Sequence, residues 1–173
     1  SHTFATYVLP SLLIQLQQEF PHIRFSVQMM NSLEVLQAVE HHTVDLGFIE
    51  KPLSAPTIKR FSLMEDQLVL AGNLEKGPWL VRENTSGVYY YTKRFLEEKD
   101  IDSPVMEIQN NEVIVGLLKQ GFGCSLVSER AVEGIPHQRL DESYKRNFYL
   151  IRRKTSASDD IVKCGEFIYE WSK

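Results

Sequence analysis

The first fifty residues alternate between helix-like and strand-like hydrophobic patterns, and this order restricts the fold more than any other feature. Residues 24–30 (RFSVQMM) alternate apolar and polar side chains, as strands do. Residues 44–49 (VDLGFI) form a nearly continuous apolar run, typical of a strand covered on both faces. A helix pattern precedes each strand, and the first has apolar residues at Leu9, Leu12, Leu13, Leu16 and Phe20. The order helix, strand, helix, strand predicts βαβ units, and a first strand is expected before Ser1.

Proline and hydroxyl residues indicate where these helices start and stop. The first helix ends before Pro21, and Pro10 must lie near its start because proline lacks the N–H that a helix interior needs. Its expected cap is Thr3 or Thr6, between which the sequence does not choose. Ser32 is the expected N-cap of the second helix.

A second α/β series follows the first. Gly121 has the place of a left-handed residue after a helix, and Ser128 is expected to cap a short helix. The second series begins with residues 77–84 (GPWLVREN). The patterns predict strands in residues 61–72, 105–108, 124–127 and 147–153, with helices near 87–98, 111–120 and 159–171.

We therefore expect two lobes joined by extended crossings. Residues 1–53 form the first part of lobe I, and 54–73 a crossing and a lobe I strand. Residues 74–136 form lobe II, and 137–173 a return crossing and a C-terminal lobe I element. Such lobes enclose a cleft, and open α/β sheets bind ligands at the carboxyl ends of their strands.

Composition excludes several classes of protein. The net charge of −4 and the short, scattered basic clusters argue against nucleic-acid binding by the chain itself. Cys124 and Cys164 lie in apolar patterns without CxxC spacing, so a reducing cytoplasm is expected rather than a disulfide framework. No apolar run approaches a membrane span, and no secretion signal is recognised.

Catalytic and metal-binding motifs are weak. The stretch GFGCS (121–125) follows a helix rather than a strand and lacks the third glycine of a dinucleotide fingerprint. Cys124 has no assignable basic partner, and the five histidines show no zinc spacing. We expect no catalytic residue, no metal and no cofactor.

Several of these segments together resemble a known family. SHTFATYVLPSLLIQLQQEFP, NSLEVLQAVEHHTVDLGFI, EDQLVLAG, PWLVRENTSG and NNEVIVGLLKQGFGCSLVSERAV resemble, in order and spacing, the effector-binding domain of LysR-type transcriptional regulators. The resemblance implies an α/β, two-lobed type 2 periplasmic-binding-protein-like fold. Each lobe would be a mixed, mostly parallel sheet with flanking helices, joined to the other by two crossing strands.

The same resemblance implies the function. A small-molecule effector, with a carboxylate expected, would bind between the lobes, and the subunits would pair as a homodimer or tetramer in the cytoplasm. DNA would be reached only through an upstream winged helix-turn-helix that this chain does not include, and no membrane is involved. The alternatives are a solute-binding receptor of a transporter or an enzyme on the same fold. The sequence upstream would distinguish the three.

In lobe I, the resemblance places Ser1, His2 and Thr3 at the lip of the cleft. Backbone N–H groups and hydroxyls at a helix start hold anions such as carboxylates, and the alternative is simple self-capping. Asn31 and Ser32 start the second helix and would face the same cleft, with capping as the alternative for Ser32. Glu50 would repel an anion or pair with an ammonium or hydroxyl group, unless it is a hinge carboxylate paired with Lys51 or an arginine.

In lobe II, the candidates lie in RENTSG and at the next helix start. Arg82 could clamp a carboxylate, while Thr85 and Ser86 could donate hydroxyl protons. Asn110 aligns with a position that often contacts the effector in the family. The alternatives are a surface arginine and capped helix starts.

Overall fold

Two strands carry the chain between two structural units. The computed structural model describes residues 1–155 and 157–173. Unit 1 comprises Ser1–Glu65 and Asn147–Lys173, and unit 2 comprises Asp66–Arg146. The boundaries fall within β2 (Ile58–Gly72) and β7 (Lys145–Arg153), so each of these strands contributes residues to both units.

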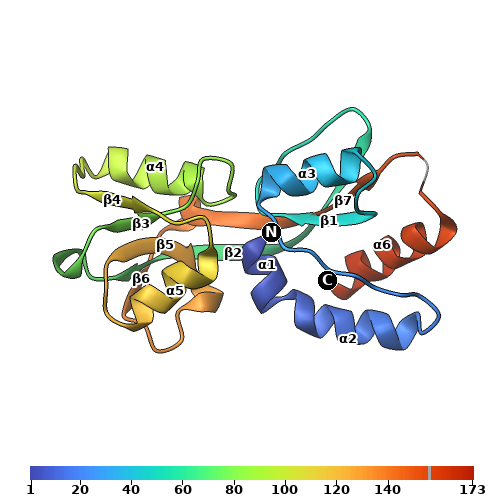
Figure 1. The fold of residues 1–173 in the computed structure, drawn as a ribbon, viewed down its shortest axis with the longest axis horizontal. Coiled ribbons are helices and arrows are strands. Elements are labelled where there is room, and N and C mark those ends of the chain that lie inside the picture. The colour runs from blue at the N-terminus through green and yellow to red at the C-terminus, as the bar shows by residue number, and fades with distance from the viewer. Residues whose placement is uncertain (156) are drawn as a thin grey trace. The chain divides into compact units, whose positions relative to one another are not determined.

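Unit 1 is a small sheet with helices on both faces (Figure 1). β1 (Leu46–Ile49) pairs antiparallel with β7, with Phe48 opposite Leu150. Its helices are α1 (His2–Tyr7), α2 (Leu9–Glu19), α3 (Ser32–Glu40) and α6 (Asp159–Trp171). Side chains alternate across β7: Phe148 and Leu150 pack with α1, α2 and α6, whereas Ile151 packs with α3. The alternation therefore produces two separate cores in this unit.

Unit 2 is a mixed sheet with α4 (Tyr89–Glu98) and α5 (Asn111–Lys119) against it. β3 (Trp79–Val81) lies parallel to both β4 (Val105–Glu107) and β5 (Cys124–Ser128). β2 runs antiparallel to β5 and to β6 (His137–Arg139). Trp79 is fully buried beside Phe95 of α4. Three short 3-10 helices complete the unit: Leu74–Lys76, Glu129–Ala131 and Glu142–Tyr144.

A buried carboxylate in unit 2 marks the point where β2 and β7 enter it. Ser128 donates its hydroxyl to Asp66 Oδ1 at 2.6 Å, and Arg146 Nε donates to Oδ2 at 2.9 Å. Arg130 Nε lies 3.3 Å from Oδ1. A charge removed from water is tolerated only with such partners. Asp66 thus ties β2, β5 and the start of β7 together.

Most predicted elements are confirmed. The mixed α/β class is as expected, although antiparallel pairs are more prominent than the mostly parallel sheets that the resemblance implied. Gly121 has φ +76° after α5, and the Ser128 hydroxyl caps a 3-10 turn by accepting from the N–H of Arg130. No helix among the described residues is long and apolar enough to span a membrane.

The strand predicted at residues 24–30 is wrong for this structure. The segment carries no strand assignment, although its sequence alternates apolar and polar residues. A strand needs a hydrogen-bonding neighbour, and none of the described strands pairs with it. Alternation alone could not reveal whether that neighbour is present.

Both predicted helix caps in unit 1 are also wrong. The first helix is two helices separated at Val8, and Val8, not Thr3 or Thr6, is the N-cap residue of α2. The α3 cap is Asn31 instead of Ser32: its side chain accepts from Glu34 N–H while the Glu34 side chain accepts from Asn31 N–H. This reciprocal arrangement requires an acidic residue three positions after the cap, which Asn31 has and Ser32 lacks.

The close packing of α3 on β1 yields a first prediction. A Cβ atom added at Gly47 would lie 2.5 Å from Val35 Cγ1, a stiff β-branched side chain, whereas one added at Gly116 in α5 meets nothing within 4 Å. Gly47→Ala should therefore lower the free energy of unfolding by about 1–3 kcal/mol. Gly116→Ala should raise it by about 0.5–1 kcal/mol, because alanine is the better helix former. Urea unfolding followed by circular dichroism tests both, and equal stability of the two variants would contradict the described packing.

Candidate functional site

Three polar side chains of unit 1 meet where β1 ends and where α1 and α3 begin. The Ser1 hydroxyl lies 3.0 Å from the Ser32 hydroxyl and donates to the carbonyl oxygen of Phe48 at 3.1 Å. Ser32 Oγ accepts from the backbone N–H of Glu50 at 3.1 Å. We call Ser1, Ser32 and Glu50 the polar cluster of unit 1. All three are buried, so their positions are fixed by each other rather than by water.

The carboxylate of Glu50 caps the N-terminus of α1, although Glu50 is far from this helix in the sequence. Glu50 Oε1 accepts from the backbone N–H of Phe4 at 3.0 Å, in the first turn of the helix. The Ser1 hydroxyl makes no capping bond of its own. A carboxylate at a helix N-terminus is favourable because that end carries partial positive charge. Glu50 therefore stabilises the start of α1 through the backbone N–H of Phe4.

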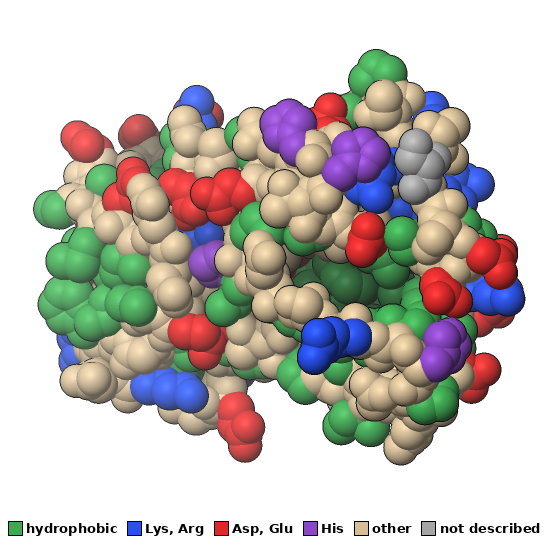
Figure 2. Space-filling model, turned by 45° about the vertical axis from the view of Figure 1, so that its right-hand side comes forward, with side chains coloured by type: hydrophobic (Ala, Val, Ile, Leu, Met, Phe, Trp, Pro, Cys, Tyr) green, Lys and Arg blue, Asp and Glu red, His purple; other side chains and the backbone are tan. Residues whose placement is uncertain are grey.

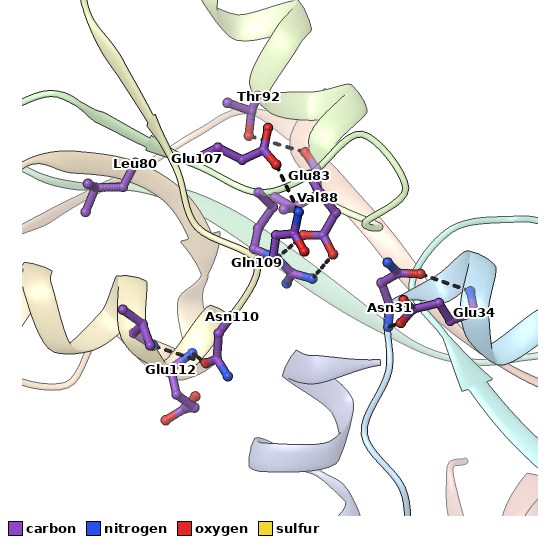
Figure 3. Close-up of polar contacts among 12 residues, drawn as sticks. Asn31, Glu34, Leu80, Glu83, Val88, Thr92, Glu107, Gln109, Asn110 and Glu112 are labelled. Atoms are coloured by element: carbon purple, nitrogen blue, oxygen red, sulfur yellow. Dashed lines mark hydrogen bonds and ion pairs between the residues drawn. The ribbon is translucent and has the colours of Figure 1, made fainter.

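The remaining unit 1 candidates lie on the same two helix starts. His2 and Thr3 are buried in the first turn of α1. Asn31 is buried and forms the cap of α3, the role that the sequence analysis gave to Ser32; Figure 3 shows its side chain beside Glu34. The structure thus brings the unit 1 candidates together around one end of β1.

In unit 2, Arg82 is buried rather than on the surface. Its Nε donates to Glu83 Oε1 at 2.7 Å and its Nη2 to Oε2 at 3.3 Å, which is the two-pronged geometry of an arginine–carboxylate pair. A ligand carboxylate would have to share this guanidinium with Glu83. Glu83, the next residue in the chain, was not among the candidates predicted from the sequence.

The other unit 2 candidates differ in what they contact. Asn110 is exposed and caps α5, its side chain accepting from the N–H groups of Glu112 and Val113 (Figure 3). Thr85 is half-buried. Ser86 is 1% exposed, and its hydroxyl has no hydrogen-bond partner among the described residues. A buried hydroxyl without a partner is uncommon, since burial without a hydrogen bond is unfavourable.

Nucleophilic and metal chemistry find little support in the described part of the chain. Burial raises the pKa of the Cys124 thiol to about 12, so the thiol stays protonated at neutral pH. Burial also raises the pKa of Cys164. Within residues 1–155 and 157–173, no group of three or more His, Cys, Asp or Glu side chains is placed to hold a metal ion.

A comparison with protein families identifies the family of this chain. The LysR substrate binding domain model matches residues 1–168, which is nearly the whole chain. The chain belongs to the LysR substrate binding domain family. A relative in Escherichia coli strain K12, the uncharacterised HTH-type transcriptional regulator YeiE, is 30% identical over 151 residues, covering 77% of this chain and 50% of that protein. The LysR domain described here therefore spans about half the length of this curated relative.

Solved structures confirm the type 2 periplasmic-binding-protein-like fold of this LysR domain. The regulatory domain of Synechocystis PCC6803 CcmR in complex with 2-PG aligns with a TM-score of 0.81 at 18% identity, covering 98% of this chain and 93% of that one. The effector binding domain of QuiR in complex with shikimate aligns with a TM-score of 0.83 at 16% identity, covering 99% and 93%. At these identities the likeness establishes the fold, not the ligand.

Two buried serines of this LysR domain provide a matched test of the polar contacts. Ser32→Ala removes the acceptor of the Glu50 N–H and should lower the free energy of unfolding by about 1–3 kcal/mol. Ser86→Ala removes a buried hydroxyl without a partner and should raise the free energy of unfolding by about 1 kcal/mol, because the unpaired group is unfavourable. Urea unfolding of the two variants checks this difference. Similar losses for both would show that the Ser32 contacts do not stabilise unit 1.

Proposed function

We propose that this chain is the ligand-sensing domain of a LysR-type transcriptional regulator and that it binds a small carboxylate-bearing effector. The observation that carries the proposal is the convergence of two helix starts on the end of β1, in a chain that belongs to the LysR family. Helix N-termini bind anions through backbone N–H groups and the helix dipole. The expected location of the ligand in a cleft between the lobes stays a prediction.

The polar cluster also favours a particular kind of ligand. The first turn of α1 favours negative charge, but the Glu50 carboxylate already accepts from it. A second anion nearby is repelled unless the ligand also brings a donor to Glu50. We therefore propose an effector with a carboxylate for the Ser1–Thr3 turn and a hydroxyl or ammonium group for Glu50. In unit 2, Arg82, Thr85, Ser86 and Asn110 are the proposed further contacts.

Signal transmission follows from thermodynamics. An effector changes a conformational equilibrium only through different affinities for the two states. We propose that it does so in a homodimer or tetramer in the cytoplasm, and that DNA is bound by a separate N-terminal domain of the whole protein. The full-length relatives of this domain are transcriptional regulators, which supports this reading over a transporter receptor.

We propose that the domain is not an enzyme. The candidate ligand contacts are mainly hydroxyls, amides and backbone N–H groups, which suit binding rather than proton transfer. Cysteine is the most nucleophilic side chain type in the sequence, and the thiols of Cys124 and Cys164 are both buried with raised pKa values.

Thermal denaturation with a panel of small carboxylates, shikimate among them, tests the site. A ligand at roughly 100 times its Kd stabilises by about 2.7 kcal/mol, which raises the Tm by several degrees. Thr3→Ala should abolish the Tm rise that the best carboxylate gives, because it alters the first turn of α1. Thr6→Ala, later in the same helix, is the control and should keep the rise. An unchanged affinity in the folded Thr3→Ala variant would overturn this placement of the site.

Glu50→Gln tests the proposed ligand chemistry. The glutamine oxygen still accepts from Phe4 N–H, but the negative charge is gone. Affinity for a carboxylate without a hydroxyl or amine should rise about threefold to tenfold, because repulsion is removed. Affinity for the matching hydroxy or amino acid should rise less or fall. Isothermal titration of such ligand pairs measures both, and an equal change within each pair would contradict the role given to Glu50.

A further inference from the structure

The exposed face of α4 in unit 2 carries its charged side chains in an ordered pattern. Residues one helical turn apart lie on the same side of a helix, so this face has two rows. One row is Lys93 followed by Glu97, and the other is Arg94 followed by Glu98. Lys93 and Glu97 are exposed and form no ion pair among the described residues, whereas Arg94 Nε lies 3.7 Å from Glu98 Oε1. Figure 2 shows acidic and basic side chains together at the upper left of the molecule, where α4 lies in Figure 1.

The same face carries aromatic side chains that are held in place. Tyr90 is 57% exposed, and its ring meets the ring of Tyr91 edge-on, with the centroids 5.4 Å apart. The Arg94 guanidinium lies 4.3 Å from the ring centroid of Tyr144, and its Nη2 donates to the carbonyl oxygen of Ser143 at 2.7 Å. Tyrosine and arginine are among the residue types that contribute most binding energy at protein interfaces. Because these contacts already fix the Arg94 side chain, it loses little entropy when a partner binds.

The order of charges on α4 is complementary to itself. In each row a base is followed by an acid one turn later, so a second α4 that runs antiparallel across this face presents acids to bases. With a two-fold axis near the middle of the helix, Lys93 faces Glu97 of the second copy. Arg94 then faces Glu98 of the second copy, and the symmetry repeats both pairs. A parallel arrangement would instead bring like charges to the same level.

We propose that this face of α4, formed by Tyr90, Lys93, Arg94, Glu97 and Glu98, is a contact surface for a second copy of the chain, packed antiparallel about a two-fold axis. The proposal rests on the homodimer or tetramer proposed above, because it names one surface of that assembly, but it does not involve effector binding. An interface of standard size buries about 1,600 Å², which is more than two ten-residue helices provide. The contact is therefore weak on its own and depends on protein and salt concentration.

Charge reversal tests the pairing. Lys93→Glu makes one row wholly acidic and Glu97→Lys makes it wholly basic, so each variant repels its own copies. Sedimentation velocity at low salt, over about 10 to 500 µM protein, measures self-association. Each single variant should need at least about tenfold higher concentration than the wild type to associate, whereas the double variant, which restores opposite charges, should associate like the wild type. Lys154→Glu, the same charge change at an exposed position of unit 1, is the control and should have no effect.

Mixing the two single variants provides a second measurement. Fluorescence energy transfer between dye-labelled Lys93→Glu and Glu97→Lys chains should exceed the transfer within either variant alone, because the mixed pair places acids against bases. Equal self-association of all variants, which is expected if the face binds a different protein, would overturn the proposal, and so would a double variant as weak as the single ones. A wild type that stays monomeric would overturn the proposed assembly as well. Neither result bears on ligand binding at the polar cluster of unit 1.

Discussion

The hydrogen bond from Phe4 N–H to the Glu50 carboxylate is the interaction on which the candidate site depends. It joins the start of α1 to the end of β1 across 46 positions of sequence. Ser32 extends the link by accepting from Glu50 N–H, so that α3 begins at the same point. Because all of these groups are buried, each holds its position only while the others are present. The result is a set of helix starts held together by buried hydrogen bonds, and such preorganisation favours recognition of a small anion.

This constraint also explains why ligand binding and stability overlap in unit 1. The helix N–H groups that attract an anion are partly used by the protein's own carboxylate. An incoming ligand therefore gains most if it offers Glu50 a donor while its carboxylate uses the remaining positive end of α1. In unit 2, Arg82 is in the same situation, since Glu83 already occupies its guanidinium. In each unit, a charged candidate group therefore already has a partner within the protein: Glu50 accepts from Phe4 N–H, and Arg82 is paired with Glu83.

The sequence predicted the elements of the fold well because helix and strand periodicities depend on local burial. It failed where a distant partner decides the outcome. Residues 24–30 have the pattern of a strand but not its neighbour, and the sequence did not indicate that the Glu50 carboxylate accepts from the backbone N–H of Phe4, 46 positions away. The Asn31 cap was recognisable, since Glu34 follows three residues later. The burial of Arg82 was not, because exposure depends on tertiary packing.

Mapping of a bound carboxylate onto the backbone amides by NMR tests the central claim most directly. The ¹⁵N-labelled chain is titrated with the carboxylate that gives the largest thermal stabilisation. The account predicts that the largest chemical-shift changes occur at Thr3, Phe4, Ser32 and Glu50, where α1 and α3 begin. Changes confined to residues 23–30 and α6, with these four amides unaffected, would contradict it.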